Sequence, residues 1–122
     1  MDKEKFKPII DILAFLGSQK HYSYIDRLGN ALDEISILEA INDAIRDFYS
    51  MCGSKQTECP QIDSGKLQDA VKVLTDMIQD SEKSTRFQVL QFARELSLNS
   101  YAHIKNFVPS KKEEGTEQLT GA

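Results

Sequence analysis

Both cysteines of the 122-residue chain lie in residues 50–65, SMCGSKQTECPQIDSG, the stretch of the sequence with the most potential for chemistry. Six residues separate Cys52 from Cys59, whereas structural zinc sites usually use C-x2-4-C pairs and redox sites use C-x-x-C. The two histidines, His21 and His103, are remote from both cysteines in the sequence. The spacing therefore predicts neither a metal site nor a thioredoxin-like pair.

A disulfide between Cys52 and Cys59 is sterically conceivable, because a short segment can fold back within the Cα distance that a disulfide requires. Disulfides are rare in the reducing cytosol, which is the compartment that the rest of the sequence favours. Cys52 also continues the apolar register of the residues before it, as a small buried side chain would. We therefore interpret the two cysteines as unpaired thiols in different local environments.

The sequence contains no recognisable catalytic motif. It lacks G-x-S-x-G, the P-loop, G-x-G-x-x-G and the R-x4-H pattern of a helical nuclease. The Glu-x-x-His pairs of di-iron bundles are also missing, although acids such as Asp43 and Asp47 lie four residues apart. Two histidines without an assigned partner do not make a catalytic set. We expect no enzymatic activity, no cofactor and no metal.

The segment Tyr101–Asn106, YAHIKN, superficially resembles the phosphoacceptor helix of histidine phosphotransfer domains, which are also helical bundles of this size. In that family an exposed histidine is followed by leucine, lysine and glycine. Here lysine comes at the second position after His103 instead of the third, and Asn106 and Phe107 replace small residues. The resemblance implies a phosphate-carrying role that needs an exposed imidazole, and the alternative is a packing or solvent-facing histidine.

One group of candidate binding residues comes from the segment KHYSY, residues 20–24, which places an imidazole and two phenols in a short connection. Amphipathic aromatic side chains are enriched where partners bind, although they also cover the ends of a core. The second group comes from the uneven charge. Residues 26–80 carry eleven acidic and five basic side chains, whereas residues 83–112 carry one acidic and six basic ones. The candidates from both groups are His21, Tyr22, Tyr24, Arg86, Arg94 and Lys105.

The spacing of apolar residues predicts helices that would position these groups. The first helix is expected over residues 5–16, with Gly17 as its stop. Its apolar stripe consists of Phe6, Ile9, Ile10, Leu13 and Leu16.

The longest apolar series extends from Ile25 to Cys52 in steps of three and four. We expect one long, kinked helix that ends near Met51 with Gly53 as its cap. Two helices remain the alternative, because Gly29 weakens the interior and Ser36–Glu39 matches a capping box.

Two further helices are expected after the cysteine stretch. One follows a cap at Asp63 or Ser64 and ends near residue 80, and the other begins at a cap at Ser84. The last series, from Phe87 to Val108, is apolar over a wide face, which suggests a central and well-buried helix, or two helices with a joint at Asn99–Ser100.

The sequence as a whole predicts an all-α antiparallel bundle of four to five helices in one domain, residues 1–108, followed by a disordered tail, residues 109–122. The N-terminus does not read as a secretory signal and no apolar run reaches the ~20 residues that span a bilayer, so we expect a cytoplasmic protein without a membrane partner.

We therefore expect a non-catalytic, regulatory protein-binding module, of the adaptor, inhibitor, immunity or chaperone kind, with a homodimer as one form. The alternative function is nucleic-acid binding through residues 83–112. It is not favoured, because the basic residues are spread out and not clustered.

Overall fold

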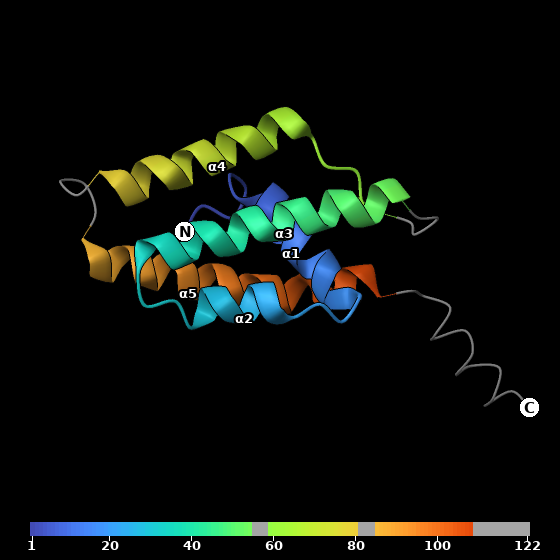
Figure 1. The fold of residues 1–122 in the computed structure, drawn as a ribbon, viewed down its shortest axis with the longest axis horizontal. Coiled ribbons are helices and arrows are strands. Elements are labelled where there is room, and N and C mark those ends of the chain that lie inside the picture. Colours follow the sequence, from blue (N-terminus) through green and yellow to red (C-terminus); the bar gives the residue numbers. More distant parts are fainter. Residues whose placement is uncertain (55–58, 81–84, 109–122) are drawn as a thin grey trace, which may run out of the picture.

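The fold is described by a computed structural model that covers residues 1–54, 59–80 and 85–108. Within these ranges the chain forms five α-helices and a final 3-10 helix, and no strand. From α2 onward, consecutive helices run antiparallel (Figure 1). The predicted all-α bundle is confirmed, whereas the predicted tail lies outside the described residues. The elements are α1 (Lys7–Ser18), α2 (Ser23–Gly29), α3 (Glu34–Ser54), α4 (Ser64–Gln79), α5 (Arg86–His103) and η1 (Ile104–Phe107).

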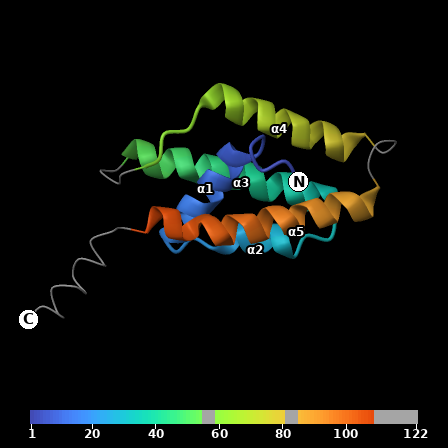
Figure 2. The same ribbon diagram turned by 180° about the vertical axis from the view of Figure 1, so that it is seen from behind.

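The central helix of the bundle is α1. Eight of its 12 residues are buried, against five of 18 in α5, and in both ribbon views α1 passes through the middle of the bundle (Figures 1 and 2). Ile12, Ala14 and Phe15 add buried apolar surface outside the predicted stripe. A helix that is apolar on all sides must be covered on all sides. The prediction that the last helix occupies the centre is therefore wrong.

The predicted stop of α1 at Gly17 is also wrong, because Gly17 lies inside the helix and is buried. A Cβ atom at Gly17 would lie 2.6 Å from Cδ1 of Ile104, so the glycine lets η1 pack against α1. The helix ends one residue later, and Lys20 takes the left-handed conformation with φ of 71°. The N–H groups of Lys20 and His21 donate to the carbonyls of Gly17 and Leu16, which satisfies the end of the helix.

The apolar series from Ile25 to Cys52 forms two helices, so the expected single long helix is wrong. The side-chain amide of Asn30 donates to the carbonyl of Asp26, 2.9 Å away, at the end of α2. The carboxylate of Asp33 then accepts the backbone N–H of Ser36 at 2.7 Å, as an N-cap does. This bond is the main reason that the pKa of Asp33 is lowered. Local capping ends one helix and starts the next, although the apolar spacing continues through both.

Cys52 and Cys59 form a disulfide, with a Cα–Cα distance of 5.9 Å, so the interpretation as unpaired thiols is wrong. The bond joins the last turn of α3 to the connection that leads into α4. Both cysteines are half-buried and pack against the core. The bond therefore holds Cys59 against the end of α3.

The last two helices begin at side-chain caps. The carboxylate of Asp63 accepts the N–H of Lys66 at the start of α4, and Thr85 forms a reciprocal capping box with Gln88 at the start of α5. The cap predicted at Ser84 lies outside the described residues. No joint occurs at Asn99–Ser100, since α5 is continuous from Arg86 to His103. Both side chains donate to carbonyls one turn earlier in that helix.

The inner face of α5 packs on α1 and α2. The hydroxyl of Ser97 donates to the carbonyl of Ile25, 3.0 Å away, and a Cβ atom at Gly29 would lie 3.0 Å from the same hydroxyl. Small residues therefore allow α2 and α5 to approach closely. Within the described ranges, no helix combines the length and apolar character needed to cross a membrane.

Candidate protein-binding surface

The helix α5 has two faces of opposite exposure. The inner face consists of the buried residues Val89, Ala93, Leu96, Ser97 and Ser100. The opposite face carries large apolar side chains that remain exposed, with Phe87 at 75%, Leu98 at 69% and Tyr101 at 40% of their full accessible surface. We call this outer face the α5 stripe and define it as Phe87, Arg94, Leu98, Tyr101 and Lys105.

Members of the α5 stripe follow one another at intervals of seven, four, three and four residues, which keeps them on one side of a helix. Lys105 lies in η1, which continues from the end of α5. The width of the apolar pattern in this segment predicted a central and well-buried helix, or two shorter helices. Instead, one face is buried by the bundle, and the other is left without a covering element among the described residues.

The basic residues predicted as binding residues differ in their electrostatic surroundings. Arg86 makes two contacts to the carboxylate of Glu34, with its Nε 3.2 Å from Oε1 and its Nη2 3.4 Å from Oε2. The backbone N–H of Glu34 and the guanidinium of Arg86 lower the pKa of Glu34. Arg94 and Lys105 are exposed and form no ion pair within residues 1–54, 59–80 and 85–108. Positive charge is therefore unneutralised at these two positions of the α5 stripe.

Tyr101 connects the α5 stripe to α2. Its ring stacks on that of Tyr22, with centroids 6.2 Å apart and an angle of 18° between the planes. Its hydroxyl donates to Oδ1 of Asp26. This hydrogen bond, followed by burial and by the charge of Asp26, raises the pKa of Tyr101 to about 12. The predicted residue Tyr22 thus borders the α5 stripe, and the Tyr101 ring is held in a defined orientation.

The other two predicted residues, His21 and Tyr24, lie together at a different place. Both contact Oδ2 of Asp47 on α3, with His21 Nδ1 at 3.2 Å and the Tyr24 hydroxyl at 3.0 Å. Burial, and then the hydrogen bond to Asp47, raises the pKa of Tyr24. Arg27 adds an ion pair to Asp43 at 3.0 Å. These contacts join α2 and the connection before it to α3. His21 and Tyr24 therefore have a structural role in the packing of the bundle.

A polar cavity of about 420 Å³ opens beside this cluster. Its charged side chains are already paired, since Asp43 contacts both Arg27 and Arg46. The cavity therefore presents no unneutralised charge that indicates a ligand. Its lining residues are Tyr24, Arg27, Asp43, Arg46, Asp47 and Ser50.

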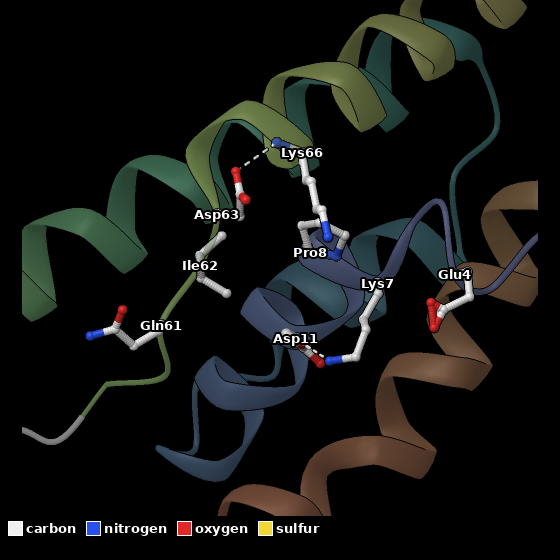
Figure 3. Close-up of a pocket in the computed structure, with 8 residues that line it drawn as sticks. All are labelled: Glu4, Lys7, Pro8, Asp11, Gln61, Ile62, Asp63 and Lys66. Carbon is white, nitrogen blue, oxygen red and sulfur yellow. Dashed lines mark hydrogen bonds and ion pairs between the residues drawn. The ribbon is translucent and has the colours of Figure 1, made fainter.

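A second polar cavity, of about 270 Å³, lies between the start of α1 and the start of α4. Figure 3 shows Lys66 extending from α4 towards Pro8 on α1. Lys7 forms an ion pair with Asp11 at 2.7 Å, and Asp63 is used as the cap of α4. Acidic and basic groups are mixed here, so the cavity favours neither an anion nor a cation.

An apolar groove of about 590 Å³ separates α3 from α4, with Ile45, Tyr49, Leu67 and Val71 among its lining residues. Lys72, at its rim, forms an ion pair with Asp76 at 3.1 Å. The groove has the apolar character of a docking site, but its rim carries no net charge that specifies an occupant.

His103 is half-buried at the end of α5, and its Nδ1 lies 2.9 Å from the carbonyl oxygen of Asn99. The phosphotransfer hypothesis requires an exposed imidazole, so this position does not support it. No group of three or more His, Cys, Asp or Glu side chains that suits a metal occurs in the described part of the chain.

Of the candidate binding residues expected from the sequence, Tyr22, Arg94 and Lys105 lie at or beside the α5 stripe, whereas Phe87 and Leu98 were not among the candidates. Both lie on the side of α5 opposite its buried residues. This position relative to the apolar spacing is the feature of the sequence that could have indicated their exposure. Comparisons with protein-family models, curated proteins and solved structures found no match to the chain.

Proposed function

We propose that the chain is a non-catalytic protein-interaction module and that the α5 stripe is its binding surface. The observation that carries this proposal is the exposure of Phe87 and Leu98 on the same side of one helix. Aligned large apolar side chains on a small domain mark a surface that another molecule covers. A tyrosine pair and an exposed arginine beside them match the composition of interface hot spots.

The rigidity of the α5 stripe also supports the proposal. The helix begins at a capping box formed by Thr85 and Gln88, and its inner face is buried along its length. The Tyr101 ring is held by Asp26 and Tyr22. A surface that is ordered before binding loses little conformational entropy when a partner docks.

Nucleic-acid binding through residues 83–112 is less well supported. Affinity for a nucleic acid comes from many contacts between basic side chains and phosphates. Arg86 is already paired with Glu34, and Leu98 occupies the middle of the surface between Arg94 and Lys105. An apolar residue at the centre of the stripe favours a protein partner.

The disulfide also bears on where the module works. A bond between Cys52 and Cys59 is stable in an oxidising compartment and is reduced in most cytosols. This supports a site of action outside the reducing cytoplasm, in place of the cytoplasmic location expected from the sequence. Trapping thiols with an alkylating reagent in protein taken directly from its native host tests this, because a disulfide leaves both cysteines unlabelled.

Affinity capture from the native host tests the interaction. Wild-type chain, a Phe87→Ser/Leu98→Ser double variant and a Tyr49→Ser control are compared as baits. Tyr49 is 46% exposed but belongs to the groove between α3 and α4, so the control changes a surface of similar exposure elsewhere. We expect a partner that is retained by wild type and the control and lost from the double variant.

Equal thermal unfolding of the three proteins must accompany this result, since it excludes a folding defect. Capture that is unchanged in the double variant, or lost only in the Tyr49→Ser control, contradicts the proposed surface. Sedimentation of the purified chain at micromolar concentration is a separate test for dimers, and a dimer would identify a second copy of the chain as the partner.

A further inference from the structure

We infer that the segment that covers the α5 stripe is an acidic amphipathic helix of a partner protein. This inference rests on the proposed function, and it adds the chemistry and shape of the partner. The apolar members Phe87, Leu98 and Tyr101 specify a nonpolar face. The basic members Arg94 and Lys105 form no ion pair among the described residues, and they specify negative charge beside that face.

The charge of the α5 stripe favours an acidic partner. No ion pair joins a described carboxylate to Arg94 or Lys105: Glu34 pairs with Arg86, Glu95 pairs with the N-terminal amine at 3.5 Å, and Asp26, which keeps its charge, accepts a hydrogen bond from the neutral Tyr101 hydroxyl. The charges of Arg94 and Lys105 are therefore not neutralised by neighbours in the described part of the chain. A partner with carboxylates opposite them gains attraction, and one with basic residues is repelled.

The spacing of Arg94 and Lys105 sets the spacing of the acidic residues on the partner. Arg94 and Lys105 are eleven residues apart, which corresponds to about 16 Å along a helix axis. A partner helix that lies along α5 matches both with acidic residues about eleven positions apart, or three helical turns. Leu98 and Tyr101 lie between the two charges, so apolar residues of the partner fall between its acidic ones.

The hydrogen-bonded backbone of α5 favours a partner that is itself a helix. The N–H and C=O groups within α5 bond to one another, so the surface offers no free strand edge for a β-type peptide. Recognition must use side chains, and two helices interdigitate side chains at intervals of three and four residues. Tyr22, stacked on Tyr101, widens the apolar surface towards α2 and gives the partner helix a second contact line.

Designed peptides test this inference independently of the native partner. The probe is a labelled amphipathic peptide of ~20 residues, with two glutamates eleven positions apart beside its apolar face. A matched peptide carries glutamine at both positions. Fluorescence anisotropy measures the binding of each to the full chain, at low and at physiological salt.

We expect the glutamate peptide to bind about five- to tenfold more tightly than the glutamine peptide, because each exposed charge pair contributes modestly. The preference should shrink at higher salt. An Arg94→Gln/Lys105→Gln variant should lose the preference but retain weak binding of both peptides. The Phe87→Ser/Leu98→Ser variant should bind neither.

Equal binding of the two peptides to wild type overturns the acidic part of the inference. Failure of both peptides, while the host partner is still captured through the α5 stripe, overturns the helical partner and leaves the proposed function standing. Capture that does not depend on the stripe overturns the proposed function itself. Displacement of the peptide by a single-stranded oligonucleotide, or a stripe-dependent dimer in sedimentation, assigns the surface to another class of partner and also overturns the inference.

Discussion

Tyr101 is a residue that serves both the packing of the bundle and an exposed surface. Its hydroxyl bonds to Asp26 on α2, while 40% of the residue remains accessible and its ring stacks on Tyr22. The same bond that joins α5 to α2 therefore orients an aromatic side chain of the α5 stripe. Recognition and stability are coupled at this residue.

The raised pKa of Tyr101 makes a prediction about alkaline stability. The folded-state pKa of about 12 exceeds the unfolded value of 10.0, so folding favours the protonated phenol. The contribution of this bond is complete below pH 10 and is lost as the pH rises towards 12. We expect wild type to be more stable than Tyr101→Phe at neutral pH, and the difference in thermal midpoint to vanish over that interval.

Spectrophotometric titration of tyrosine ionisation checks the cause, in a Tyr24→Phe background because the pKa of Tyr24 is also raised. The Asp26→Asn variant removes the carboxylate, so the late-titrating phenol should ionise closer to pH 10. A late phenol that is unaffected by Asp26→Asn would show that another group raises the pKa.

The helix α5 shows how one element can bury one apolar face and expose another. Leu96 and Leu98 are two residues apart, yet Leu96 is fully buried and Leu98 is 69% exposed. The bundle packs against one side of α5, mainly through α1 and α2. The two leucines therefore form a matched pair in which the residue type and helix are constant and only the environment differs.

Replacing each leucine by alanine separates the two roles of α5. Leu96→Ala should lower the free energy of unfolding by about 2–5 kcal/mol, because it leaves a cavity in the core. Leu98→Ala should change it by less than about 0.5 kcal/mol, because water already contacts this side chain. Urea denaturation measures both. A similar loss from both variants would mean that another part of the chain covers Leu98.

At the scale of the whole molecule, the disulfide between Cys52 and Cys59 joins the end of α3 to the approach to α4. The contacts of α4 with the rest of the bundle are to α1 and α5 more than to α3. The covalent link therefore holds Cys59, in the approach to α4, against the end of α3, where noncovalent packing between those two helices is sparse.

Removing the disulfide should destabilise the fold without abolishing it. The sequence separation of seven closes a short loop, for which the chain-entropy model gives about 2–3 kcal/mol. The Cys52→Ser/Cys59→Ser variant should lose about this much free energy of unfolding in urea. Wild type in a reducing agent should match the variant, and wild type whose stability does not respond to reductant would contradict the contribution assigned to the bond.

Most of the helical framework could be predicted from the sequence, whereas the partners of individual side chains could not. Helix α4 begins at Ser64 after its Asp63 cap, as expected from local capping and apolar spacing. The continuous apolar register from Ile25 to Cys52 concealed the break between α2 and α3, because periodicity survives a change of helix. The disulfide could not be predicted, because the sequence gives no distance between Cys52 and Cys59, and disulfides are rare in the reducing cytosol that was expected for the protein.

The sequence by itself determined that apolar side chains recur at helical intervals, and this periodicity is enough to specify an all-α bundle. Only the tertiary structure decided that α1 and not α5 lies at the centre, and which apolar residues of α5 remain in water. The physical reason is that periodicity describes where side chains point around one helix. Burial depends on which other helices come to cover that side, and this is settled by packing between residues distant in the chain.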